Sequence, residues 1–153
     1  MSTRLQHLAE TMTAAAGWQS PVPGDDGSYR FSLEGGLDFA LLTPENRTGI
    51  FLADLGDAPE KGSLAGDEET KRLASVAAAS LKKRRSSFAV AGTRLELSRV
   101  FSLQDISDRE LIEIARDFIN DLAWWKAQVA NAGGKTSSNT SNSPFSFGSF
   151  GAF

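Results

Sequence analysis

The first apolar pattern in the chain has the period of a helix. Leu5, Leu8 and Met12 recur at steps of three and four residues, and alanines fill the same side. This spacing places the apolar side chains on one face of an amphipathic helix. The pattern predicts a first helix over residues 2–17.

The period then changes to two residues. Apolar and polar side chains alternate in "SYRFSL", "LDFALLT" and "IFLADL", which begin at Ser28, Leu37 and Ile50. The turn-rich stretches "EGG" and "PENRTG" separate them. Alternation between tight turns is typical of strands joined in an antiparallel meander. We therefore predict a three-stranded meander in this part of the chain.

Alternation also divides the apolar side chains of the meander between the two faces of the sheet. We expect one face to carry Leu42, Phe51 and Leu55, and the opposite face to carry Phe39, Ile50 and Leu52. Successive side chains of a strand point to opposite faces. If helices cover one face, the other face still exposes apolar groups.

The helical period returns in residues 67–85. One face of this segment carries Leu73, Val76, Ala77 and Leu81. Alternation resumes in "SSFAVAG" and "TRLELSRVF", which are predicted to form a β-hairpin that turns at Gly92.

The start of the last helix has the clearest local signature. Ser107 is followed three residues later by Glu110, which is the pattern of a capping box. Ile106 and Leu111 have the spacing of a hydrophobic staple. Such a cap contributes about 0.5–2 kcal/mol. We predict a long final helix that begins here and ends at Gly133-Gly134.

The remaining residues, 133–153, are rich in Ser, Asn, Phe and Gly. A segment of this composition cannot bury enough apolar surface to fold alone, so we predict a disordered C-terminal tail. The sequence thus predicts one α+β domain over residues 1–132. In it, a helix, the three-stranded meander, a second helix, the hairpin and the C-terminal helix pack on one twisted sheet.

Composition narrows the possible chemistry. The chain has 16 basic and 19 acidic residues, a net charge of −3, no cysteine and one histidine, His7. It therefore offers no disulfide, no thiolate nucleophile and no ordinary zinc site. Phosphate-cradling loops, nucleophile elbows and dinucleotide fingerprints are absent from the sequence. We expect neither an enzyme nor a cofactor or metal. With no signal-like or membrane-spanning apolar run, the chain is expected to be cytosolic.

The most basic stretch is "LKKRRSS", residues 81–87. The predicted second helix begins with "DEE" and ends with "KKRR", so its charges complement the helix macrodipole. A nucleic-acid surface would instead spread its cations along one face, with aromatic residues between them. We interpret the basic run as the polar end of a helix and expect no nucleic-acid partner.

Trp124 and Trp125 are adjacent on the final helix and point about 100° apart. Two interpretations stay open. In the first, both tryptophans cover the edge of the sheet; in the second, one of them faces a partner, since aromatic side chains concentrate in binding hot spots.

The element order resembles that of the class I type III secretion chaperones, the Tir-chaperone family. The resemblance covers about residues 2–131. It rests on that order, on "FALLTPENRTGIFLADLG", on the alanine-rich "RLASVAAASL" and on "RLELSRVFSLQDISDRELIEIARDFINDLAWWKAQV". It implies a cytosolic bacterial homodimer that holds the N-terminal segment of a secreted effector in extended form, without ATP or catalysis. The secretion apparatus is a further candidate partner; a membrane is not.

An extended client needs shallow apolar grooves and a strand edge. Our candidates for client contacts are Leu5, Leu8, Met12, Leu42, Phe51 and Leu55, with ordinary core packing as the alternative for each. The resemblance implies a dimer interface near the second helix, where the candidates are Leu73, Ala74, Val76, Ala77, Ala78 and Leu81.

Two further hypotheses stay open. The chain is also compatible with a YbjN-like small α+β module that acts in regulation or assembly and has no effector client. Separately, four phenylalanines lie in the last nine residues, at 145, 147, 150 and 153. The tail could occupy the client groove until a client displaces it, or it could simply be disordered.

Overall fold

The computed structural model describes residues 3–18, 21–45 and 47–131. The elements are α1 (Thr3–Ala16), β1 (Val22–Pro23), β2 (Tyr29–Leu33), β3 (Leu37–Glu45), β4 (Thr48–Asp57), α2 (Leu64–Ser80), β5 (Ser87–Ala91), β6 (Arg94–Ser102) and α3 (Asp108–Ala130). The predicted α+β fold class is therefore confirmed. The predicted tail and the predicted helix end at Gly133-Gly134 lie outside the described residues.

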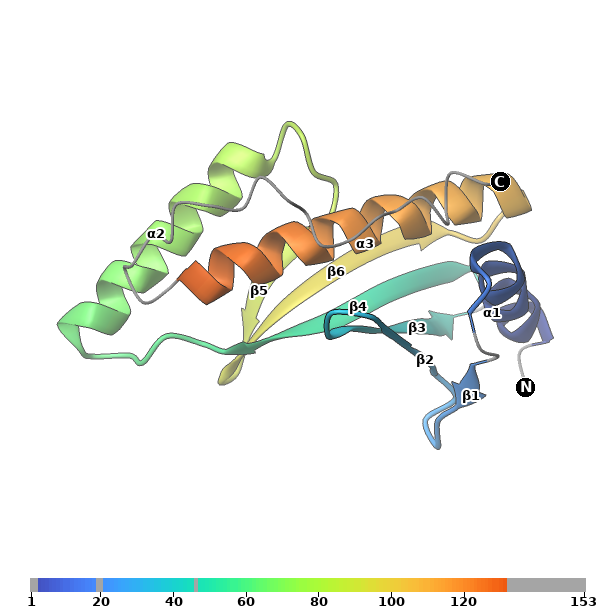
Figure 1. The fold of residues 1–153 in the computed structure, drawn as a ribbon, viewed down its shortest axis with the longest axis horizontal. Helices are drawn as coiled ribbons and strands as arrows, with labels where there is room; N and C mark the ends of the chain where they lie inside the picture. The colour runs from blue at the N-terminus through green and yellow to red at the C-terminus, as the bar shows by residue number, and fades with distance from the viewer. Residues whose placement is uncertain (1–2, 19–20, 46, 132–153) are drawn as a thin grey trace.

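The strands form one antiparallel sheet in the order β1-β2-β3-β4-β6-β5 (Figure 1). Strands β2, β3 and β4 are the predicted meander, and β5 with β6 is the predicted hairpin. The two-residue β1, which pairs with β2, was not predicted because the prolines at 21 and 23 favoured a loop. Gly35 and Gly36 have φ of 80° and 73°, so the turn between β2 and β3 uses the left-handed region that glycine adopts freely.

Helix α3 covers one face of the sheet and contacts β3, β4, β6 and α1. The core beneath it is aromatic. Phe51 stacks on Phe118 at 5.4 Å and on Phe101 at 5.0 Å, and meets Phe39 edge-on at 5.8 Å. A side chain at Gly49 would place its Cβ 2.4 Å from the Phe101 ring, so only glycine fits there. These aromatic contacts determine which face of the sheet α3 covers.

The cap of α3 is as predicted. Ser107 accepts a hydrogen bond from the Glu110 amide at 3.1 Å, and Glu110 accepts one from the Ser107 amide at 2.9 Å. Helix α1 lies beside the first turns of α3, at the end of the sheet (Figure 1). His7 on α1 approaches Asp108 at 3.6 Å, and both side chains are exposed.

Helix α2 differs from its predicted range of residues 67–85. It begins at Leu64 because Ser63 caps it, accepting a hydrogen bond from the Gly66 amide at 3.0 Å. It ends at Ser80, whose carbonyl accepts from the amides of Lys83 and Arg84, both at 2.9 Å. The basic run therefore follows α2 instead of closing it. Our interpretation of these cations as the end of the helix is wrong.

Candidate functional site

One face of the sheet has no helix on it in the described part of the chain. Helices α1 and α3 both join the core on the opposite face. On the uncovered face, Leu42 of β3 pairs with Ile50 of β4, and Ile50 pairs with Val100 of β6. Val100 is 61% exposed, and Leu42 and Ile50 are partly exposed. These three side chains form an apolar row directly across three strands.

A second row lies beside the first. Ala40, Leu52 and Ser98 are paired across the same three strands, and Leu52 is also partly exposed. We call these two rows the outer-face patch, defined by Ala40, Leu42, Ile50, Leu52, Ser98 and Val100. Unlike isolated surface hydrophobics, contiguous exposed apolar groups mark an interaction site.

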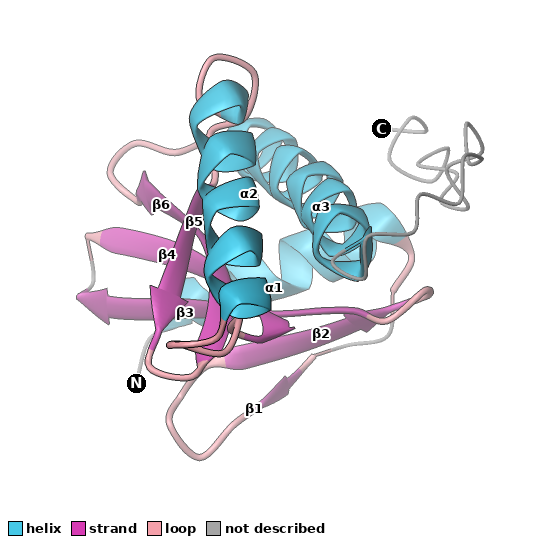
Figure 2. Ribbon diagram, turned by 90° about the vertical axis from the view of Figure 1, so that its left-hand side faces the viewer, coloured by secondary structure: helices cyan, strands magenta, loops and turns pink. Residues whose placement is uncertain are grey.

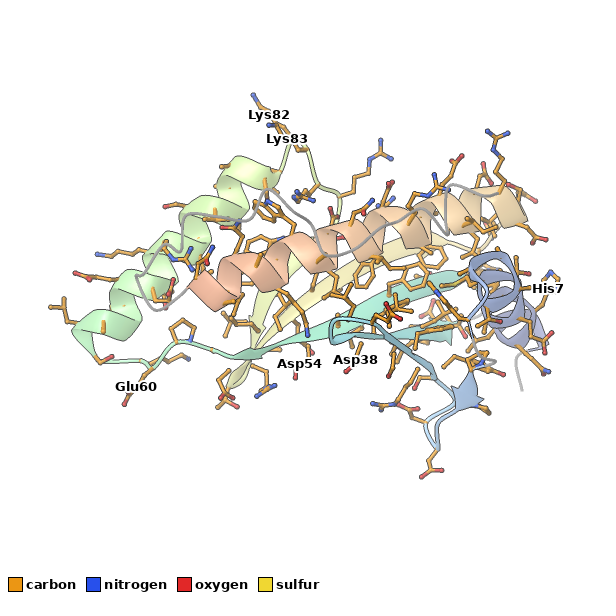
Figure 3. All side chains as sticks on the ribbon, in the orientation of Figure 1. His7, Asp38, Asp54, Glu60, Lys82 and Lys83 are labelled. Atoms are coloured by element: carbon orange, nitrogen blue, oxygen red, sulfur yellow. The ribbon has the colours of Figure 1, made fainter. Side chains whose placement is uncertain are left out.

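Farther along the same face the side chains become charged. Asp38 and Asp54 project from the sheet on the side away from α3 (Figure 3). Arg94 donates hydrogen bonds to Asp54 and, at 2.6 Å, to Asp57. The hydrogen bond from Arg94 holds the pKa of Asp54 below its ordinary value. Asp54 is paired across the strands with Glu96, so the patch has an acidic margin.

The predicted division of the meander into faces is wrong in part. Phe51 and Leu55 lie on the covered face, where Phe51 is 0% exposed and pairs with Leu41. Of the three strand residues proposed to contact a client, only Leu42 lies on the uncovered face. The error came from β4: the sequence gives no sign of which of its two apolar sets, Ile50 with Leu52 or Phe51 with Leu55, packs under α3.

The helix candidates are also part of the core. Leu5, Leu8 and Met12 are each buried in the cluster that joins α1 to α3 and the sheet. In this conformation they stabilise the position of α1 and do not form a groove. A client could contact them only if α1 moved, and their role in binding stays a prediction.

The six candidates for a dimer interface divide between two sides of α2. Leu73 is buried, and Val76 and Ala77 pack against the core. Ala74, Ala78 and Leu81 are exposed, Leu81 to 75%. Steps of four and three residues place these last three on one side of the helix. We call them the α2 stripe.

Polar contacts also join α2 and the loop after it to α3. Arg72 donates to the carbonyl of Gln128 at 2.7 Å, and Arg84 pairs with Asp121 at 2.9 Å. Figure 2 views the molecule from the side on which α2 lies, with β5, the last strand of the sheet, behind it. Only β6 pairs with β5, so the other edge of β5 has no strand partner in the described chain. The α2 stripe and this edge are open to a second chain.

The two tryptophans have different environments. Trp125 is 0% exposed and stacks on Phe88 at 4.1 Å. Trp124 is partly exposed and lies under the Arg84 guanidinium, 4.2 Å from its ring centre. Trp125 therefore belongs to the core, and Trp124 fixes the loop after α2.

The described residues contain no cluster of three or more groups that could hold a metal ion. None of the described helices is long and apolar enough to cross a bilayer. The arrangement is suited to binding an apolar segment.

Sequence comparison gives no relative: no protein-family model matches the chain, and no curated protein matches it significantly. Comparison with solved structures does find similar proteins. The chain is similar to a chain of the ExsC–ExsE complex (TM-score 0.62, 12% identity, 83% of this chain and 94% of that one). It is also similar to a chain of the HopA1–SchA chaperone–effector complex (TM-score 0.58, 12% identity, 79% and 91%).

A third similar structure is that of the Yersinia pestis type III secretion chaperone SycH in complex with a stable fragment of YscM2 (TM-score 0.55, 12% identity, 78% and 98%). The alignments cover nearly the whole of these chains, so the shared architecture is that of an entire domain. The chain therefore has the fold of a class I type III secretion chaperone.

Proposed function

We propose that this protein is a cytosolic chaperone of type III secretion. It binds the N-terminal segment of a secreted effector in extended form and keeps that segment from folding or aggregating. The observation that carries the proposal is the outer-face patch, an apolar surface that no described helix covers. An extended segment can lie across it and bury alternate side chains against the two rows.

The charges beside the patch add a preference for the client. Asp38 and Glu96 lie at its acidic margin, and no ion pair involves either of them among the described residues. A client segment that carries apolar residues next to a Lys or Arg would complement this surface. Electrostatic complementarity of this kind contributes chiefly to association rate and specificity.

We further propose that the chaperone is a homodimer joined through the α2 stripe and β5. The stripe exposes Leu81, and β5 exposes Val90 to 49%. Alanines at 74 and 78 allow a second helix to approach closely. An obligate interface of this kind is expected to bury roughly 2,000 Å² or more.

Dimerisation can be tested by light scattering. We expect the wild-type chain at a mass near twice 16.4 kDa. Ala78→Asp with Leu81→Asp should weaken the dimer by about tenfold or more, because two charges would be buried against apolar surface. Ala65→Asp is the control: it adds a charge on α2 about 140° from Ala78 around the helix. A monomeric wild type, or equal weakening by the control, would contradict this interface.

The function itself is tested by co-expression with the product of the adjacent gene, because a chaperone is often encoded beside its client. We expect a stable complex with that product's N-terminal segment, and no complex with the same protein lacking it. A YbjN-like regulatory module would form the dimer but capture no such segment. A chain that binds only the folded remainder of the neighbouring protein would overturn the chaperone proposal.

A further inference from the structure

The loop after α2 forms one side of a surface pocket of about 240 Å³. Its lining residues are Lys83, Arg84 and Arg85 of the loop, Arg99 of β6, and Asp117, Asn120 and Asp121 of α3. Lys83 lies at the tip of the loop, beside Lys82 (Figure 3). The basic run therefore lines a pocket that has no part in the proposed chaperone function.

Part of the lining is already neutralised. Asp121 is 5% exposed and accepts hydrogen bonds from Arg84 at 2.9 Å, from the Ser86 amide at 3.2 Å and from the Ser86 hydroxyl at 2.6 Å. Arg84 also lies over the Trp124 ring at 4.2 Å. Arg84 and Asp121 neutralise each other's charge, and their contacts hold the loop against α3.

The rest of the lining is not neutralised. Lys83, Arg85 and Arg99 face a single further carboxylate, Asp117, which leaves an excess of two positive charges. Among the described residues, none of these three cations forms an ion pair. The Nη1 atom of Arg99 is buried and has no hydrogen-bond acceptor in the described chain. Arg99 is partly buried, so its charge is screened less by solvent than the charges of the exposed Lys83 and Arg85.

We propose that this pocket binds a phosphate dianion, either inorganic phosphate or the phosphate group of a small phosphomonoester. A phosphate group carries about −1.5 to −2 charges at pH 7, which matches the excess of two; a carboxylate would leave one positive charge uncompensated. Arg99 lines the pocket from β6 and can donate to a phosphate oxygen, as Lys83 and Arg85 can from the loop. Asn120 offers a neutral donor at the same site.

The size of the pocket restricts the ligand. Drug-sized ligands occupy pockets of about 300–1,000 Å³. A pocket of about 240 Å³ accommodates a phosphate group with a few further atoms. The net charge of −3 and the concave, localised site also argue against a nucleic-acid backbone, which needs cations spread along a face. This proposal is independent of the chaperone function.

The test is a titration of the full chain with inorganic phosphate, followed by ³¹P NMR and calorimetry at constant ionic strength. We expect saturable binding with a Kd on the order of 1 mM. Arg99→Gln and Lys83→Gln should each weaken binding by about tenfold, as expected for hydrogen bonds to a charged group. Lys82→Gln is the matched control: it removes the same charge from the adjacent residue, which does not line the pocket, and should change the Kd by less than about twofold.

The competing ligands separate the alternatives. Sulfate should compete with phosphate and acetate should not. Tighter binding of glycerol phosphate than of inorganic phosphate would assign the site to a phosphomonoester, and equal binding would assign it to free phosphate. Lack of saturation, equal loss in Lys82→Gln, or preferential binding of a glutamate-rich peptide or of duplex DNA would each overturn the proposal. If Arg99→Gln does not fold, Arg99→Lys takes its place in the titration, because it keeps the charge but removes the guanidinium donors.

Discussion

Phe51→Ala is expected to lower the free energy of unfolding by about 3–5 kcal/mol. The side chain is 0% exposed and contacts the rings of Phe39, Phe101 and Phe118 from the middle of the sheet. Its removal leaves a cavity between β4 and α3 that the stacked rings cannot close without moving the helix. Urea unfolding at a fixed protein concentration measures the loss, since a dimer makes apparent stability concentration-dependent.

Leu42→Ala provides the comparison for Phe51→Ala. Leu42 is partly exposed on the uncovered face, so its truncation should cost less than about 1.5 kcal/mol. The same two variants distinguish a core residue from a client contact. If Phe51→Ala kept its stability and lost only client binding, Phe51 would belong to the outer face and the described packing would be wrong.

Val100→Asp is expected to weaken client binding by about 30-fold or more, which corresponds to about 2 kcal/mol and is typical of a hot spot. Val100 is 61% exposed at one end of the row with Ile50 and Leu42. A carboxylate there would be buried unpaired beneath an apolar client segment. Calorimetry with the isolated client segment measures the change in Kd.

The folded state should tolerate this substitution, because Val100 is mostly exposed in the free chain. We expect the free energy of unfolding to change by less than about 1 kcal/mol. Ala127→Asp is the control for added charge, since Ala127 is exposed on α3. Unchanged affinity in Val100→Asp, or equal loss in both variants, would remove the outer-face patch as the client surface.

Local signals in the sequence predicted the elements well. The capping box at Ser107 has both of its hydrogen bonds, and the change of period at Ser28 correctly separated the first helix from the meander. Each of these features depends on residues close together in the chain. The range of α2 was predicted less well. The prediction missed the local cap at Ser63, and the loop after the helix is held by Asp121, which pairs with Arg84 from 37 positions away.

The site was predicted less well because it depends on contacts between residues that are far apart in the chain. The sequence of β4 is apolar on both faces, and α3 packs on the face that carries Phe51. Alternation divides the residues of β4 into two sets on opposite faces, but it does not indicate which set a helix covers. The apolar character of Ile50 together with Val100 was visible in the sequence, but only the register of β4 with β6 brings the two into one row.

We propose that the client lies on the uncovered face of the sheet, and site-specific photo-crosslinking can locate it there. A benzophenone side chain would be placed at position 100 or, as the control, at position 127, in the complex with the client segment. We expect an adduct with the client from position 100 and none from position 127. A stable complex that gives no adduct from position 100 but does give one from position 14, on the exposed side of α1, would show that the client does not lie on the uncovered face.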